Sequence, residues 1–327
     1  MKTKFGNLKI NSNVTQKILA FAGLIVLIIV FSIASPHFLK FSNIKGILLS
    51  TAVNGVLAIG VTFVIITGGI DLSVGTGMTL AGVMTGVFIT NMKMPVPLGV
   101  LLGILTGALI GFINGIGVAK LKLPPFIATL GMMQVTKGLS LVISNAKPIY
   151  FYETPNFTKI STDSVINRLI PGFDIPNAVL IMFILALIGG AILTKTIIGR
   201  YTFAIGSNEE ATRLSGIKVD SWKILIYTIT GVFVGIAGVL MSARLNSAQP
   251  AIGTGYEMDA ISAAVIGGTS LSGGEGTMLG AIIGAFIISV ITNGLRILSV
   301  PQQWQMVVTG AIVIFAVYAD ILRRRKA

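Results

Sequence analysis

Ten apolar segments, separated by polar connections, run along the whole chain. Most are about 20 residues long, the length an α-helix needs to cross a hydrocarbon core of about 30 Å. We therefore expect an all-α, polytopic integral membrane protein in which residues 1–327 form a single transmembrane domain. The expected helices are residues 18–35, 45–68, 74–92, 96–119, 125–144, 177–195, 222–243, 258–271, 277–295 and 301–320.

The composition agrees with this pattern and removes several kinds of chemistry. Of the 327 residues, 54% are hydrophobic and 11% are charged, which is about half the charge of a soluble domain. The sequence has no cysteine, so disulfides, iron–sulfur clusters and thiolate catalysis are excluded. Its single histidine, His37, gives no imidazole cluster. We expect no catalytic residue, no metal site and no cofactor in this chain.

The distribution of charged residues along the chain predicts which loops face the cytoplasm. The sequence has 24 Lys and Arg against 11 Asp and Glu, a net charge of +13. In a soluble chain this excess would suggest nucleic acid, which we do not expect as a partner here. Cytoplasmic loops of membrane proteins are rich in Lys and Arg, so we place the basic segments and both termini in the cytoplasm. These residues are Lys2, Lys4, Lys9, Lys17, Lys120, Lys122, Lys195, Arg200, Arg213, Lys218, Lys223, Arg323, Arg324, Arg325 and Lys326.

Two longer hydrophilic stretches interrupt the apolar segments. Residues 145–176 are nearly neutral and rich in Tyr, Pro and Asn, which is typical of an external loop with short structure of its own. Residues 196–221 fall on the cytoplasmic side. Within them, Ser207 or Asn208 can N-cap one short helix at about 208–215, with acidic residues in its first turn and Gly216 after its end. The stretch is either a solvated connector or, as we favour, a docking helix for a cytoplasmic partner.

A short sequence repeat marks two places where helices break. "GGIDLSVGTGMTL" begins at Gly68 and "GGTSLSGGEGTML" begins at Gly267, with seven identities in thirteen positions. The repeat indicates either a duplicated hairpin or shared turn chemistry. Non-helical backbone in a membrane persists only where it is buried in protein or faces water. Gly68, Gly69, Gly267 and Gly268 are therefore candidates for hinges or for a translocation pathway.

A few polar side chains lie inside the expected spans, where they are costly. Lys137 and Gln134 are one turn apart and either face an aqueous path or extend to the outer interface. Asp71 either caps the following helix, which we favour, or binds substrate. Asn293, like Asn54 and Asn114, is an uncharged polar residue within a helix. Such residues more often form hydrogen bonds between helices than contacts with a ligand.

Two glycine patterns need separate interpretations. Glycines four residues apart at 103–115 and 276–284 predict close helix packing, static or moving. "LSGGE" at residues 271–275 matches the signature of an ABC ATPase, but the chain has no Gly-Lys pair and hence no phosphate-binding loop. We interpret this match as coincidental.

Several motifs together resemble the membrane permease of bacterial ribose-type ABC sugar importers. They are "TGGIDLSVG", "PPFIATLGMM", "GRYTFAIGSNEEATRLSGIKV", "LNSAQPAIGTGYEMDAISAAVIGGTSLSGGEGT" and "ITNGLRIL", and they span nearly the whole chain. The resemblance implies an importer permease fold of about ten helices in a homodimer or heterodimer. It also implies an external sugar-binding protein and a cytoplasmic ATPase, which uses the ATP and magnesium.

The same resemblance assigns residues 199–219 to the coupling helix that contacts the ATPase. Thr212 stands where the family has an alanine, which leaves the individual contacts open. The expected coupling residues are Asn208, Glu209, Glu210, Ala211, Arg213, Leu214 and Gly216.

The resemblance implies import of a monosaccharide, most simply ribose, across the cytoplasmic membrane of a bacterium. The alternative is a secondary sugar transporter driven by H⁺ or Na⁺, for which Asp71 and Asp259 are the acidic candidates. The stretch after the seventh span, with Arg244, is expected outside as a docking surface for the binding protein.

Overall fold

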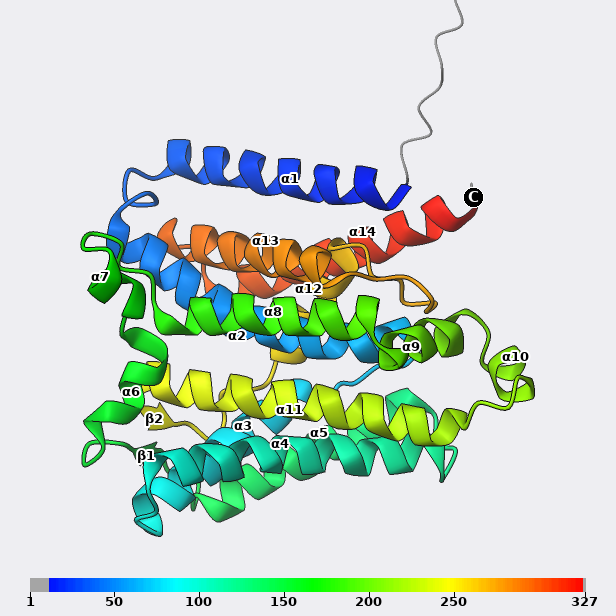
Figure 1. Ribbon diagram of the computed structural model, residues 1–327. Coiled ribbons are helices and arrows are strands. Elements are labelled where there is room, and N and C mark those ends of the chain that lie inside the picture. The colour runs from blue at the N-terminus through cyan, green and yellow to red at the C-terminus, as the bar shows by residue number, and fades with distance from the viewer. Residues whose placement is uncertain (1–11, 326–327) are drawn as a thin grey trace, which may run out of the picture.

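The computed structural model describes residues 12–325, and about three quarters of them are helical (Figure 1). Lys2, Lys4, Lys9 and Lys326 lie outside the described residues. The elements are α1 (Ser12–Ala34), α2 (Phe41–Ile66), α3 (Val74–Gly86), the π-helix η1 (Val87–Asn91), α4 (Val96–Ala119), α5 (Pro125–Ile143), β1 (Ile149–Tyr150), α6 (Pro155–Thr162), α7 (Val165–Leu169), α8 (Asn177–Lys195), α9 (Ile197–Ser207), α10 (Glu209–Leu214), α11 (Val219–Leu245), β2 (Ser247–Ala248), α12 (Tyr256–Ile266), α13 (Met278–Ile297) and α14 (Gln302–Arg325).

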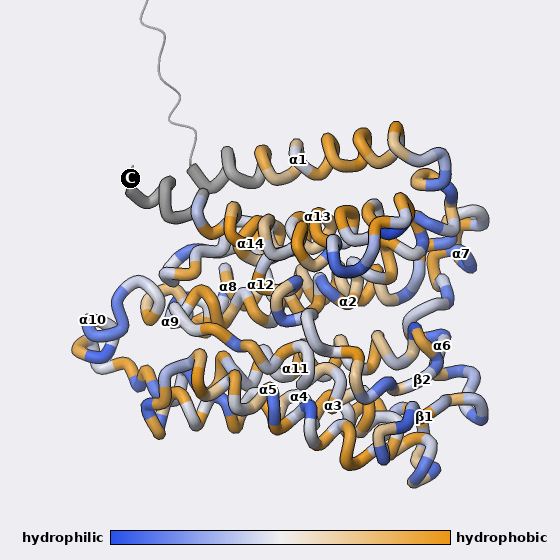
Figure 2. Tube along the Cα trace, turned by 180° about the vertical axis from the view of Figure 1, so that it is seen from behind, coloured by the Kyte–Doolittle hydropathy of each residue, from blue (hydrophilic) through white to orange (hydrophobic). Residues whose placement is uncertain are grey.

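The long helices run side by side across the molecule, and the short elements gather at its two ends. Figure 1 shows α9 and α10 at one end and α6, α7, β1 and β2 at the other. The chain between these ends is predominantly apolar, whereas both ends are hydrophilic (Figure 2). This is the arrangement that a bilayer imposes on a bundle of spanning helices. The chain is an integral membrane protein.

Each of the ten expected helices has a helical counterpart, although one of them ends well before its predicted last residue. Among the described residues, six helices are long and apolar enough to cross a membrane: α2, α4, α5, α8, α11 and α13. The expected helix 74–92 is α3 followed by the π-turn η1. The expected helix 258–271 is wrong at its end, because α12 stops at Ile266 and Gly268 turns the chain with a φ of +96°.

The hydrophilic stretch at residues 196–221 differs from its prediction. The sequence predicts one helix in residues 196–221, but the structure has two, α9 and α10. The extra helix α9 is amphipathic and buries Gly199, Thr202 and Ile205 on one face. These positions follow the helical period of three to four residues, and this period was the signal that the sequence interpretation overlooked.

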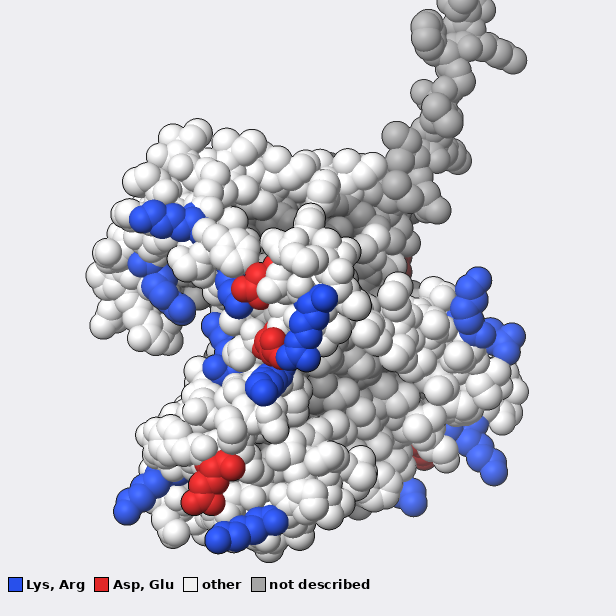
Figure 3. Space-filling view, turned by 60° about the vertical axis from the view of Figure 1, so that its left-hand side comes forward, with Lys and Arg blue, Asp and Glu red and all other residues white. Residues whose placement is uncertain are grey.

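The end that carries α6 and α7 forms its own small structure. β1 pairs with β2 in antiparallel register, with Ile149 opposite Ala248, and the rings of Phe151 and Phe157 pack 4.1 Å apart. The expected short structure of residues 145–176 is therefore present, and it is joined to the stretch that follows α11. In Figure 3, which turns this end toward the viewer, basic and acidic side chains lie intermingled on it.

α4 and α11 pack closely against each other. A Cβ added at Gly107 would lie 2.6 Å from the Cα of Gly235, and one at Gly111 would lie 2.1 Å from the carbonyl oxygen of Tyr227. Only glycine allows the two backbones to approach this closely. The glycine pattern at 103–115 is thus a packing surface between two long helices.

Replacing Gly107 by Val should separate α4 from α11 and destabilise the bundle by about 1–3 kcal/mol, the usual cost of overpacking. The matched control is Gly131→Val on α5, where an added Cβ has no neighbour within 4 Å. Thermal unfolding of the purified protein in detergent measures both. Equal melting temperatures for the two variants would contradict the packing role.

Candidate functional site

The two repeated glycine motifs form the same turn in the structure. After α2, the N–H of Gly68 donates to Ile65 O and the N–H of Gly69 donates to Val64 O. After α12, Gly268 and Thr269 make the corresponding bonds to Val265 O and Ala264 O. Both turns are Schellman caps with a left-handed glycine, at Gly68 with φ +77° and at Gly268 with φ +96°.

The structural alignment of the two caps differs by one residue from the alignment of the two sequence motifs. The repeat aligns Gly68 with Gly267, but Gly267 is right-handed, and Gly268 takes the left-handed position. A shift of one residue favours shared turn chemistry as the source of the similarity. In the first copy the break covers residues 67–73, because α3 starts at Val74, as expected, and includes Gly75 and Gly77.

Asp71 holds the first break together. Its side chain is 2% exposed, and Oδ1 accepts hydrogen bonds from Ser73 N at 2.9 Å, Ser73 Oγ at 2.6 Å and Asn114 Nδ2 at 3.4 Å. Asn114 Nδ2 also donates to Ser73 Oγ at 2.8 Å. These bonds fix the entry into α3 and give Asp71 a structural position.

Gln134 and Lys137, the other polar pathway candidates, lie on α5. Gln134 is exposed and Lys137 is half-buried. Neither lines the cavity between α2, α12, α13 and α14.

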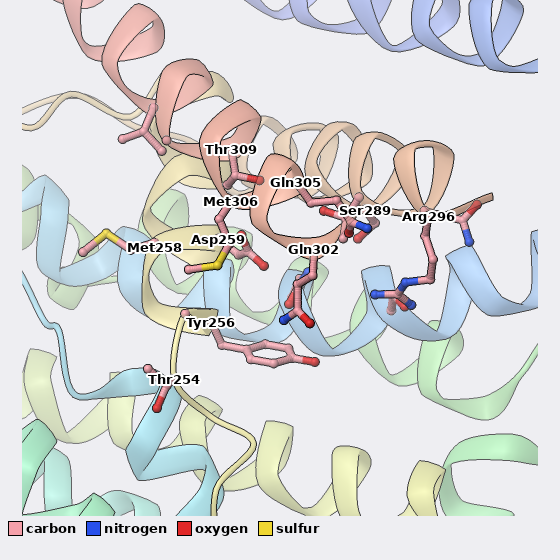
Figure 4. Close-up of a pocket in the computed structure, with 17 residues that line it drawn as sticks. Thr254, Tyr256, Met258, Asp259, Ser289, Arg296, Gln302, Gln305, Met306 and Thr309 are labelled. Carbon is pink, nitrogen blue, oxygen red and sulfur yellow. The ribbon is translucent and has the colours of Figure 1, made fainter. Parts of the chain in front are cut away.

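One cavity has a volume of about 620 Å³, within the range of about 300–1,000 Å³ that is typical of ligand pockets. It lies between α2, α12, α13 and α14 (Figure 4). In Figure 4 the side chains of Tyr256, Gln302 and Arg296 surround one space. The lining residues are Ser50, Asn54, Thr254, Gly255, Tyr256, Met258, Asp259, Ser289, Thr292, Asn293, Arg296, Gln302, Gln305, Met306, Thr309, Gly310 and Val313.

Most of these lining residues are polar and uncharged. Asp259 and Arg296 supply one charge of each sign. Asn54 Oδ1, Ser289 Oγ and Asn293 Oδ1 have no hydrogen-bond partner among the described residues, although Asn293 Nδ2 donates to Asn43 Oδ1 at 3.0 Å. A wall that offers amides, hydroxyls, a carboxylate and a guanidinium can both donate to and accept from a neutral, multiply hydroxylated ligand.

Arg244, the expected docking residue, points toward this cavity. Its Nη2 donates to Ser50 Oγ at 3.0 Å, and Ser50 is one of the lining residues. Its role in docking a binding protein stays a prediction. Within residues 12–325, no three His, Cys, Asp or Glu side chains come together as a metal site.

The short helix α10 lies at the opposite end of the long helices from α6 and α7 (Figure 1). Asn208 caps it, because its Oδ1 accepts from Ala211 N at 2.9 Å, and Gly216 ends it with a φ of +82°. Leu214 is 80% exposed, and Glu210 and Ala211 are also exposed. The expected helix with caps at both ends is confirmed.

A chain of ion pairs holds α10 against two neighbouring elements. Glu209 pairs with Lys223 at 2.6 Å and with Arg213 at 3.2 Å. Arg213 also reaches Asp220 at 3.1 Å, and Asp220 binds Lys122 at 2.9 Å. The network therefore joins α10 to the start of α11 and to the connection between α4 and α5.

The pKa of Glu209 shows the balance within this network. Partial burial raises the pKa, but the Lys223 ammonium and the Arg213 guanidinium outweigh burial and hold it below its ordinary value. A lowered pKa means that the pairs stabilise α10 at neutral pH. They are lost as the pH falls through the folded-state pKa.

Comparison with known proteins identifies the family. A family model described as the permease component of branched-chain amino acid transport systems matches residues 43–317. The chain belongs to this permease family. The ribose import permease RbsC of Bacillus subtilis (strain 168) is 43% identical over 309 residues, covering 94% of this chain and 93% of that protein.

Two further relatives give the same result at greater distance. RbsC of Escherichia coli (strain K12) is 41% identical over 297 residues, 91% of each chain. The xylose transport permease XylH of the same strain is 33% identical, covering 89% of this permease and 87% of XylH. No solved structure matches the permease.

The sequence interpretation found little of the cavity in this permease. Of the pathway candidates, Asn293 alone lines it. The overlooked signal is a polar face with helical spacing on each of the last two helices. Ser289, Asn293 and Arg296 form that face on α13, and Gln302, Gln305 and Thr309 form it on α14.

Replacing Glu209 by Gln should loosen α10. The exposed pairs to Lys223 and Arg213 are each worth about 0.2–1 kcal/mol, so trypsin should cut after Arg213 about two- to fivefold faster in the folded permease. The control is Glu210→Gln, because Glu210 is exposed and makes no ion pair among the described residues. Unchanged cleavage in Glu209→Gln would show that the network does not hold the helix.

Proposed function

We propose that this permease is the membrane subunit of an ATP-driven importer that carries a monosaccharide into a bacterial cell, and that ribose is this monosaccharide. ATP and magnesium are used by a cytoplasmic ATPase partner, and this chain itself supplies the passage. An external binding protein delivers the sugar, and a second copy of the permease completes the membrane unit. Residues 1–327 act as one transmembrane domain.

The lining of the cavity carries the sugar assignment. The family description names branched-chain amino acids, whose aliphatic side chains would leave the polar groups of this wall unpaired, at about 1–3 kcal/mol for each buried group. A sugar instead presents hydroxyls that both donate and accept, and the ring of Tyr256 offers an apolar face to its carbon skeleton. The ribose and xylose permeases among the relatives support the same cargo.

The charge distribution supports the orientation that we propose. Basic residues gather at the end of the molecule that carries α9 and α10: Lys120 and Lys122 between α4 and α5, Lys195 at the end of α8, Arg200 in α9 and Lys218 before α11. This end is therefore cytoplasmic under the positive-inside rule, and both termini share its side. With α1, α3, α12 and α14 added to the six long apolar helices, the permease crosses or enters the membrane ten times.

The proposal gives α10 the role of the coupling helix. A helix of six residues has little stability of its own in water, and its exposed Leu214 offers an apolar contact to a partner. The proposed contact residues are Asn208, Glu209, Glu210, Ala211, Arg213, Leu214 and Gly216.

A transport assay in vesicles tests the function. The permease is reconstituted with the ATPase and the sugar-binding protein proposed as its partners, and uptake of radiolabelled ribose is compared with uptake of xylose, galactose and leucine. We expect ATP-dependent uptake of ribose and none of leucine. Sugar uptake that needs an ion gradient and is abolished by Asp71→Asn or Asp259→Asn, without ATP, would instead establish a secondary transporter.

Loss of polar groups from the cavity should slow transport without blocking hydrolysis. Asn54→Leu and Asn293→Leu each remove the amide that a sugar hydroxyl would bind, and uptake should fall about tenfold, the effect of ~1.4 kcal/mol. Gln134→Leu removes a similar group from α5, outside the cavity, and should transport normally. The opposite result, with only Gln134→Leu impaired, would move the path to α5.

A further inference from the structure

Three backbone segments meet at Gly206, in the last turn of α9. The N–H of Gly274 donates to the carbonyl oxygen of Ile66 at 2.8 Å. A Cβ added at Gly206 would lie 1.7 Å from that same oxygen and 2.6 Å from Gly274 N, and one added at Gly273 would lie 2.7 Å from Gly206 O. No side chain separates the segments, so backbone contacts backbone at a hydrogen-bonded crossing.

The three segments lead to different parts of the molecule. Ile66 is the last residue of α2, and residues 267–277 connect α12 to α13. These three helices form three of the four walls of the cavity, through residues such as Asn54, Tyr256 and Asn293. On the other side, Gly206 lies two residues before Asn208, the N-cap of α10.

The crossing also accounts for the "LSGGE" motif at residues 271–275. Its two glycines, Gly273 and Gly274, are both left-handed, with φ of +83° and +75°. They bring their backbone against Gly206 and Ser207. The motif thus has a structural role in a chain without a phosphate-binding loop.

Contact between backbones transmits displacement more directly than contact between side chains. A side chain can change rotamer and absorb a shift, whereas close-packed backbones joined by a hydrogen bond move together. The end of α9 therefore cannot shift without displacing both the end of α2 and the connection between α12 and α13.

We propose that Gly206 is a positioning residue that makes the end of α9, the end of α2 and the connection between α12 and α13 move as one unit. A displacement of α10 then reaches three walls of the cavity through a single crossing. The inference rests on the proposed function, because it takes α10 as the point where the ATPase acts.

The first experiment replaces Gly206 by Ala in the reconstituted transporter. The added methyl group forces the segments apart, so sugar transported per ATP hydrolysed should fall about tenfold, within the range of coupling between distant sites. The ATPase should still co-purify and hydrolyse ATP. The matched control is Gly190→Ala on α8, which has no neighbour within 4 Å of an added Cβ and should keep the wild-type ratio. A wild-type ratio in Gly206→Ala would overturn the inference.

A second experiment does not depend on how well Gly206→Ala folds. The protein has no cysteine, so Ser207→Cys with Gly274→Cys creates one defined pair. A Cβ at position 274 lies 3.3 Å from Ser207 Cα, which is close enough for a disulfide. If the segments move as one unit, the oxidised pair should transport like each single Cys variant.

One other result would overturn the inference. Transport that is lost on oxidation and restored by a reductant would show that the segments slide past each other. The proposed function fails separately, if the wild-type complex imports no sugar with ATP.

Discussion

The structure depends on one constraint: backbone groups that are buried where a helix stops must find partners within the protein. An unpaired buried carbonyl costs about 1–3 kcal/mol, because burial removes the water that would otherwise pair with it. The carbonyl of Ile66, which the end of α2 leaves without a helical partner, accepts from Gly274 in the second break. The N–H of Leu72 in the first break donates to Thr129 Oγ1 on α5 at 3.1 Å. The breaks are therefore stable only in the presence of neighbouring helices, and the first is completed by the second.

Glycine has two distinct physical roles in this arrangement. At Gly68 and Gly268 it supplies the left-handed conformation that ends a helix. At Gly107 and Gly206 it supplies the absence of a side chain, so that backbones can touch. In the sequence both kinds are glycines in similar motifs. A cap glycine such as Gly68 has room for a side chain but needs its left-handed φ, whereas a contact glycine such as Gly206 has an ordinary helical φ but no room for a side chain.

Those two roles explain how far the sequence could predict the structure. Helix positions follow from hydropathy, and the caps of α10 follow from the chemistry of Asn208 and Gly216. The cavity could not be predicted as a unit, because it joins residues of α2 with residues some 200 positions later, and each polar side chain looks like ordinary interhelical glue on its own helix. Arg244 illustrates the same limit. Its position near the end of α11 suggests an outward contact, whereas the approach of Ser50 directs its guanidinium toward the cavity.

α14, the fourth wall of the cavity, is not attached to the crossing at Gly206 in the way that α2, α12 and α13 are. α14 supplies Gln302, Gln305 and Thr309, but it follows α13 through residues 298–301, near the end where α11 stops. The nearest neighbours of Gly206 among the described residues are Ile66 and Gly274, which do not belong to α14. Its Gln305 is tied to that short connection, since Nε2 donates to Val300 O at 2.8 Å. A unit that carries α2, α12 and α13 would therefore move relative to α14. The volume between them, and the polar groups that face each other across it, would change most along the face of α14. A cavity built from one separately anchored wall and three linked walls can change its shape without breaking the close backbone contacts that hold the bundle together.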